Sequence, residues 1–270
     1  MKTINGFRLW DEWYANRKIK IEDVGDVKEF AQSTGVMLRG DGVVQYGFVS
    51  GDYIIPIKDY HPCSIHGRNE DQKVALHILG DSKIPLKILS GVAGSGKTLL
   101  ACAHALHQYK NPKGGKAKII IAKAMTPIGK EIGHLKGGME DKVRPWLGPF
   151  YDNFLNCGIP PYEIDDMVAN GELEITPITF IQGRSISNTI IIIDEVQNLD
   201  LNVVKQIVTR AAEGSEIILL GDQTQKFEHR VKESTLDILI ERAHDSKLVG
   251  HIHLDKSLRS LIADWAVKNL

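Results

Sequence analysis

The chain has 270 residues, 43% of them hydrophobic, and a formal net charge of -1 at pH 7. This composition allows one sizeable α/β core with a small additional unit, and the balanced charge excludes the overall positive field of proteins that bind nucleic acid over their whole surface. No apolar run reaches membrane-spanning length, the first 20 residues are too charged and aromatic for a signal peptide, and the 3 cysteines are far apart, so we expect a protein of the reducing cytoplasm that has no membrane partner.

The first 66 residues differ in texture from the rest of the chain. Short helices are predicted over residues 7–14 and 26–33, and the alternation of residues 42–57 predicts a hairpin that turns at Gly51 and Asp52. We therefore expect residues 1–66 to form a small separate α+β element, whose role the sequence does not indicate, ahead of a main domain over residues 67–270.

A complete Walker A phosphate-binding loop, Gly-Val-Ala-Gly-Ser-Gly-Lys-Thr, occupies residues 91–98. The apolar run 84–89 before it predicts a buried strand, and residues 99–109 after it predict a helix. In that order the loop N–H groups face a β-phosphate, Lys97 reaches the β/γ oxygens, and the Thr98 hydroxyl ligates Mg²⁺. The residues expected to bind the phosphates are Gly91, Val92, Ala93, Gly94, Ser95, Gly96, Lys97, Thr98 and Leu99.

Strands and helices are predicted to alternate after the loop. Strands are expected over residues 118–122, 173–176, 189–193, 217–220 and 249–253, and helices over 139–156, 161–169, 201–212, 234–245 and 257–268. This alternation predicts an α/β fold with a mainly parallel sheet covered on both faces, the RecA-like architecture of P-loop NTPases. Ligands bind such a sheet at the carboxyl ends of its strands.

Two carboxylates end the most apolar of these strands. Residues 190–193 are four consecutive isoleucines, and Asp194 and Glu195 follow directly. A buried parallel strand would bring both side chains out beside the phosphate loop. We expect Asp194 to hold Mg²⁺ through water and Glu195 to polarise the attacking water, because this is the acidic half that a P-loop hydrolase needs.

Two further segments resemble motifs of superfamily 1 helicases. Residues 217–225 are a predicted strand followed by Gly-Asp-x-x-Gln, which resembles motif III, where the glutamine, here Gln225, senses the γ-phosphate. Residues 68–72, Arg-Asn-Glu-Asp-Gln, resemble the Q-motif, in which a glutamine amide pairs with the adenine edge. The resemblance implies that Arg68, Asn69 and Gln72 bind the base and select ATP, since an amide can donate and accept at once.

Together with residues 122–135, 145–152 and 180–186, these motifs make the chain similar to the PhoH-like ATPase family over residues 68–266. The resemblance is nearest to the branch in which the ATPase follows a PIN nuclease, although residues 1–66 are too short for that nuclease. It implies a PhoH-like, RecA-type ATPase domain over residues 67–270 that hydrolyses ATP with Mg²⁺.

The helicase resemblance also implies a path for single-stranded RNA or DNA. It places Thr126, Lys130, Lys136, Thr179 and Arg184 along that path. Lysine and arginine side chains there could pair with phosphates. The alternative is that they are ordinary surface residues of a protein with balanced charge.

The last inference concerns assembly. Translocating superfamily 1 helicases supply the arginine that completes the ATP site from a second RecA-like domain, and this chain has one Walker A loop. Arg259 matches the late arginine of the family and could reach the γ-phosphate of a neighbour in a ring; the alternative is a surface arginine. We expect a homo-oligomer, specifically a hexamer, that acts as an RNA- or single-stranded-DNA-dependent ATPase or helicase. The alternative function is an ATP-gated regulatory or binding module without unwinding activity.

Overall fold

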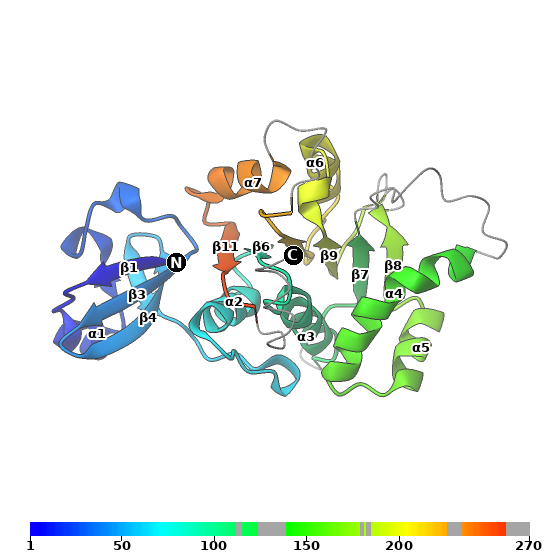
Figure 1. Cartoon of the computed structure of the whole chain (residues 1–270), viewed down its shortest axis with the longest axis horizontal. Coiled ribbons are helices and arrows are strands. Elements are labelled where there is room, and N and C mark those ends of the chain that lie inside the picture. The colour runs from blue at the N-terminus through cyan, green and yellow to red at the C-terminus, as the bar shows by residue number, and fades with distance from the viewer. Residues whose placement is uncertain (112–114, 124–138, 179–180, 182–184, 226–233, 258–270) are drawn as a thin grey trace, which may run out of the picture.

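Two β-sheets make up the framework of the computed structural model (Figure 1), which describes the chain except residues 112–114, 124–138, 179–180, 182–184, 226–233 and 258–270. The larger sheet contains β6 (Leu86–Gly91), β7 (Lys118–Lys123), β8 (Leu173–Pro177), β9 (Thr189–Asp194), β10 (Glu216–Gly221) and β11 (Val249–Leu254). Its helices are α2 (Glu70–Gly80), α3 (Lys97–Tyr109), α4 (Met139–Asn156), α5 (Pro161–Ala169), α6 (Leu201–Val208) and α7 (Thr235–Ala243). None of the helices in the described ranges is long and apolar enough to span a bilayer.

The larger sheet has the strand order β11-β6-β10-β9-β7-β8, and every neighbouring pair is parallel. Helices α2 to α5 cover one face, and α6 and α7 cover the other (Figure 1). The predicted α/β fold with a mainly parallel, RecA-like sheet is therefore confirmed. Because all six strands run the same way, their carboxyl ends meet at one edge.

Strand β9 shows how the two faces are filled. Its side chains alternate between them: Ile190 and Ile192 join the core under α2 to α5, whereas Ile191 and Ile193 join the core under α6 and α7. All four are 0% exposed. Burying an isoleucine side chain contributes about 1.5–3 kcal/mol, so this strand anchors both layers and fixes where Asp194 leaves the sheet.

Among the described residues most helix boundaries agree with the sequence prediction, and the end of α6 is an exception; the helix predicted over residues 257–268 lies outside the described residues from residue 258 on. The helix ends at Val208, whereas the apolar periodicity predicted a helix up to residue 212. Residues 210–212 instead pair with the segment before β9: the Ile186 N–H donates to the Arg210 carbonyl at 3.0 Å, and the Ala212 N–H donates to the Ile186 carbonyl at 2.7 Å. These non-local hydrogen bonds replace the last helical turn.

The smaller sheet lies in the first 56 residues and has the order β1-β3-β4-β5-β2. Its elements are β1 (Lys2–Asn5), α1 (Trp10–Asn16), β2 (Ile19–Lys20), β3 (Gly35–Gly40), β4 (Val43–Ser50) and β5 (Tyr53–Pro56). The predicted hairpin is present as β4 and β5 and turns at Gly51 and Asp52. The helix predicted over residues 26–33 is wrong: only Val27–Glu29 form a 3₁₀ turn, and Gln32 bonds instead to Gly51 through both its amide atoms.

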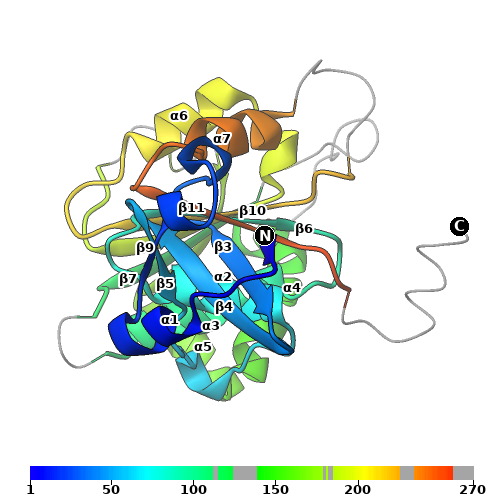
Figure 2. The ribbon, with the colours of Figure 1, turned by 90° about the vertical axis from the view of Figure 1, so that its left-hand side faces the viewer.

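Strand β4 of the smaller sheet packs against α2, and the segment before β3 reaches the edge strand β11 (Figure 2). Phe48 belongs to the same core cluster as Val74 of α2. The Gln32 N–H donates to the His244 carbonyl at 2.7 Å, and the His251 N–H of β11 donates to the Ser33 carbonyl at 3.3 Å. The second bond occupies a backbone donor that an edge strand would otherwise expose.

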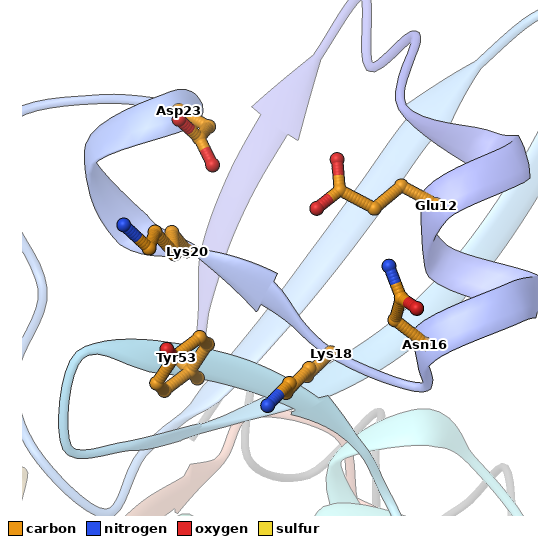
Figure 3. A pocket seen from close by; sticks show the side chains of 6 residues that line it. All are labelled: Glu12, Asn16, Lys18, Lys20, Asp23 and Tyr53. Atoms are coloured by element: carbon orange, nitrogen blue, oxygen red, sulfur yellow. The ribbon is translucent and has the colours of Figure 1, made fainter.

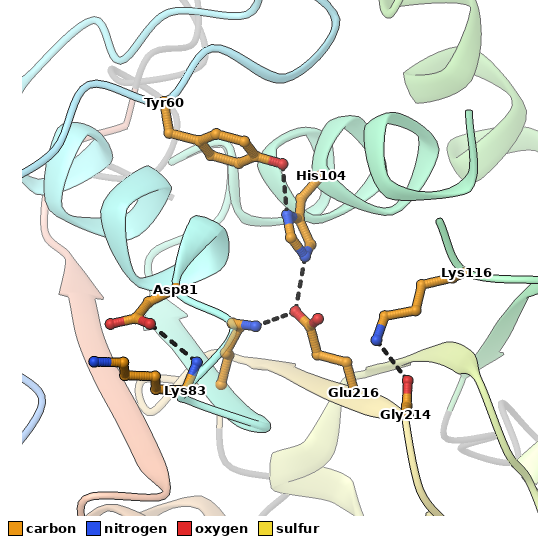
Figure 4. A network of polar contacts seen from close by, with 8 residues as sticks. Tyr60, Asp81, Lys83, His104, Lys116, Gly214 and Glu216 are labelled. Atoms are coloured by element: carbon orange, nitrogen blue, oxygen red, sulfur yellow. Dashed lines mark hydrogen bonds and ion pairs between the residues drawn. The ribbon is translucent and has the colours of Figure 1, made fainter. Parts of the chain in front are cut away.

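A buried polar network ties the strand before the phosphate loop to the helix after it (Figure 4). Glu216 of β10 accepts from Lys87 of β6 and, at 2.7 Å, from His104 Nε2 of α3. The Tyr60 hydroxyl lies 2.9 Å from His104 Nδ1, so one neutral tautomer, with its hydrogen on Nε2, satisfies both contacts. Burial lowers the pKa of His104, which keeps that imidazole neutral.

Candidate nucleotide site

The phosphate loop spans the turn from β6 to α3 in the predicted strand–loop–helix order. Three of its glycines have positive φ: 141° at Gly91, 78° at Gly94 and 94° at Gly96. At Gly91 a Cβ would lie 2.3 Å from the Leu254 carbonyl oxygen, so only glycine lets the loop run this close to β11. The sequence therefore folds here into a glycine-rich turn at a helix N-terminus, an arrangement that binds phosphate. Two of the N–H groups predicted to face the phosphate are taken by protein carbonyls: the Val92 N–H donates to Leu254 at 3.3 Å and the Ser95 N–H donates to Val92 at 3.2 Å.

Lys97 is the first residue of α3, and its ammonium lies inside the loop. Its Nζ donates to the Gly91 carbonyl at 2.6 Å and to the Val92 carbonyl at 3.0 Å. These contacts hold a positive charge within the ring of loop backbone. The charge is therefore in place for the oxygens of a triphosphate.

Asp194 ends β9 at the same edge of the sheet. The pKa of its carboxyl is raised to about 6: burial and, after it, the negative charge of Glu195 raise the pKa, while the positive charges of Lys123 and Lys97 oppose the increase. Strands β6, β10 and β9 are neighbours in the parallel sheet, so the loop lysine after β6 and this carboxylate at the end of β9 lie at the same edge. A partly buried carboxylate whose charge is costly is stabilised by a bound cation. Carboxylate and hydroxyl oxygens such as those of Asp194 and Thr98 are the ligands that Mg²⁺ prefers.

Glu195 follows in an unusual backbone conformation. Its φ is 61° and its ψ is 40°, in the left-handed region that costs a non-glycine residue about 1–2 kcal/mol. Its carboxylate accepts from Gln197 Nε2 at 2.7 Å, and Lys123 Nζ lies 3.9 Å away. Strain of this kind persists where the surroundings hold it, which is common at functional sites.

The segment after β10 forms a tight turn beside these carboxylates. The Asp222 carboxylate accepts from the Thr224 N–H at 2.9 Å and from the Thr224 hydroxyl at 2.6 Å. Gln223 Nε2 donates to Asp237 of α7 at 2.7 Å. Gln225 is exposed at the end of this turn, and its role as the γ-phosphate sensor stays a prediction.

The three residues predicted to bind the base do lie together, at the start of α2. Asn69 caps the helix by accepting from the Gln72 N–H at 2.9 Å. The Gln72 amide accepts from the Arg68 N–H at 2.9 Å and donates to the Ser95 carbonyl of the phosphate loop at 2.9 Å. The adenine-reading role stays a prediction, and the structure adds a contact to the loop that the sequence did not indicate.

One residue beside the site was missed. Gln197 contacts Glu195 and the turn after β10, and it is not among the residues predicted from the sequence. Its place two residues after Glu195 was the available signal. The residues predicted to contact nucleic acid lie outside the described residues, and so does the arginine predicted to reach a neighbouring subunit; they are Thr126, Lys130, Lys136, Thr179, Arg184 and Arg259.

A hollow lies on the smaller sheet, away from the nucleotide site (Figure 3). It has a volume of about 320 Å³ and is lined by Glu12, Asn16, Lys18, Lys20, Asp23 and Tyr53. Its lining holds two lysines and two carboxylates, so its charges are balanced. Lys20 also pairs with Glu22 at 2.9 Å, and the Lys18 ammonium lies 4.8 Å from the centre of the Tyr53 ring. None of its lining residues belongs to the nucleotide site.

Comparison with known proteins gives one family. The family model described as PhoH-like protein matches residues 64–269. The chain is 35% identical to Protein PhoH2 of Bacillus subtilis strain 168 over 271 residues, which cover 96% of this chain and 61% of that protein. It is 28% identical to Protein PhoH2 of Mycolicibacterium smegmatis, over 89% of this chain and 56% of that protein. The chain thus spans somewhat over half the length of these curated relatives.

Proposed function

The chain belongs to the PhoH-like protein family, and from that premise we propose that it hydrolyses ATP and that RNA or single-stranded DNA drives the turnover. The observation that supports this most is the convergence of Lys97, Asp194 and Glu195 at one edge of the parallel sheet. Cationic and acidic groups at that edge are what a P-loop hydrolase requires.

Each group has a distinct task in this proposal. Lys97 and the loop N–H groups bind the phosphates, and Thr98 and Asp194 would hold Mg²⁺, which neutralises phosphate charge when bound. Glu195 orients and polarises the attacking water, and Gln225 senses the γ-phosphate. Arg68, Asn69 and Gln72 bind the base and select adenine.

The nucleic-acid and assembly parts of the proposal depend on the family resemblance. With a net charge of -1 the protein has no overall positive field, so strand binding needs a local basic path, which we assign to Lys130, Lys136 and Arg184 with Thr126 and Thr179 beside them. We further propose a homo-oligomer, specifically a hexamer, that works in the cytoplasm.

ATP hydrolysis measured against increasing poly(U) and poly(dT) tests the proposal. We expect Mg²⁺-dependent turnover that rises with the polynucleotide and falls as salt is added, because phosphate contacts weaken with ionic strength. Turnover that no polynucleotide changes would contradict nucleic-acid dependence. ATP-dependent binding of the polynucleotide without turnover would instead favour the ATP-gated binding module.

A further inference from the structure

The side chain of Gln197 joins the carboxyl ends of two neighbouring strands. Gln197 lies in the 3₁₀ turn Val196–Asn198, directly after β9. Its Nε2 donates to Glu195 Oε2 at 2.7 Å, and its Oε1 accepts from the backbone N–H of Asp222, after β10, at 3.1 Å. One amide thus connects the carboxylate assigned to water activation with the turn that leads to Gln225.

The two partners define the orientation of this amide. A carboxylate only accepts and a backbone N–H only donates, so the NH₂ group must face Glu195 and the oxygen must face Asp222. Replacing the amide by a carboxylate would keep an acceptor for Asp222 and lose the donor to Glu195. Replacing it by the methionine side chain would lose both contacts at similar length.

The surroundings leave this bridge little freedom. A Cβ on Gly221 would lie 2.9 Å from Gln197 Oε1, so the glycine lets β10 approach the amide closely. On the other side, the left-handed backbone of Glu195 limits where its carboxylate can point. The turn beyond Asp222 is itself closed by the two bonds from Thr224.

We propose that Gln197 is a positioning residue that holds the Glu195 carboxylate in place for water activation and couples it to the turn after β10. The inference rests on the proposed ATPase function. Because Gln225 is proposed to sense the γ-phosphate, loss of that group would change what the Asp222–Gln225 turn contacts. A displacement of that turn then reaches Glu195 through the amide.

Steady-state kinetics of Gln197→Glu and Gln197→Met test the positioning role. A hydrogen bond to a charged group is worth about 10- to 100-fold, so we expect both variants to lose about that factor in kcat, while KM for ATP changes less than about 3-fold. Rates are expressed per nucleotide-binding site, measured with a fluorescent ATP analogue, so that misfolded protein does not count. Gln206→Glu, the same change on the exposed side of α6, is the matched control and should behave as wild type.

The coupling has its own readout. We expect the preference for binding ATP over ADP to fall in Gln197→Met, which loses the Asp222 contact, and to persist in Gln197→Glu, which keeps an acceptor there. Wild-type kcat per site in both variants, or equal loss of kcat and of analogue binding, would overturn the positioning role. A wild-type protein that binds ATP without hydrolysing it would overturn the proposed function and this inference together.

Discussion

The side-chain amide of Gln72 donates a hydrogen bond to the backbone carbonyl of Ser95, 2.9 Å away. The contact joins the start of α2, where the base is expected to bind, to the loop that is expected to bind the phosphates. A Cβ on Gly96 would lie 2.7 Å from the same amide nitrogen, so the loop glycine is also what lets Gln72 reach in. Gln72 is 4% exposed, and the cost of disturbing it is therefore that of a buried polar group.

Replacing Gln72 by alanine should alter base selection and ATP affinity together. The wild-type protein should prefer ATP to GTP in kcat/KM, and Gln72→Ala should shrink this preference by about 10-fold, because polar groups in a dry pocket lose their partner. ATP affinity should fall too, since Ser95 loses its donor. The measurement is kcat/KM for both nucleotides with Gln206→Ala as the control, and equal use of ATP and GTP by the wild type would contradict the prediction.

Substitution of Lys97 and of Glu195 should separate binding from chemistry. Lys97→Ala removes the charge that holds the phosphates and should weaken ATP binding by about 10-fold or more. Glu195→Gln keeps the shape of the side chain but cannot polarise water, so it should bind ATP normally and turn over about 100-fold more slowly. Equilibrium binding of a fluorescent ATP analogue, followed by single-turnover hydrolysis, tells the two apart; equal loss of affinity in both would refute the assigned roles.

The larger sheet was predictable because its signals are local. The Walker A loop needs a strand before it and a helix after it, and the four β-branched isoleucines before Asp194 indicate a strand buried on both faces. The smaller sheet was not predictable in the same way. Strand β1 pairs in parallel with β3, whose partner residues lie 34 positions away, and no local pattern reports such a pairing.

The same reasoning explains what was seen of the site. Lys97, Asp194 and Glu195 are marked by motif and by position at a strand end. The bridge from Gln197 to Asp222 exists only because β9 and β10 are neighbours in the sheet, a fact that the sequence order does not contain. The loop contact of Gln72 is tertiary in the same sense.

Arg259 is predicted to complete the ATP site of a neighbouring subunit. An arginine finger is worth about 10³–10⁵ in rate, so Arg259→Ala should bind ATP and lose most of its turnover. Mixing Arg259→Ala with Glu195→Gln subunits should restore activity that neither variant has alone, because some interfaces then pair an intact Glu195 with an intact Arg259. If subunits exchange, as mass photometry would reveal, and no mixing ratio restores activity, the finger does not act in trans.

Buried histidines should make the fold sensitive to mild acid. Burial lowers the pKa of His77 and of His251 to about 4, and the His77 Nε2 atom is buried with no hydrogen-bond partner among the described residues. As pH falls from about 6.5 to about 4, the unfolded chain takes up protons that the folded chain cannot, so the free energy of unfolding decreases. This stabilisation is complete above pH 6.5 and is lost toward pH 4, with about 3 kcal/mol as the upper bound for each histidine.

Urea unfolding at pH 7 and pH 5 checks this prediction with His77→Gln, which keeps an acceptor near the Lys58 N–H but does not titrate. Between these two pH values the variant should lose about 2 kcal/mol less stability than the wild type. An identical loss in both proteins would show that His77 does not contribute to the acid sensitivity.

The buried pair of Lys87 and Glu216 should stabilise the fold only as a pair. Lys87 is 0% exposed. Burial alone would raise the pKa of Glu216, but the contacts of this carboxylate with His104 and Lys87 lower its pKa to about 2. Lys87→Met leaves that carboxylate buried without its cation and should cost about 3–5 kcal/mol. Adding Glu216→Gln removes the stranded charge and keeps an acceptor for His104, so the double variant should be more stable than Lys87→Met alone. Lys87 lies near the start of β6, whereas the phosphate loop begins at the end of that strand, so turnover per folded site should stay close to wild type in the double variant. Strictly additive losses of unfolding free energy in a double-mutant cycle would contradict the coupling of Lys87 and Glu216.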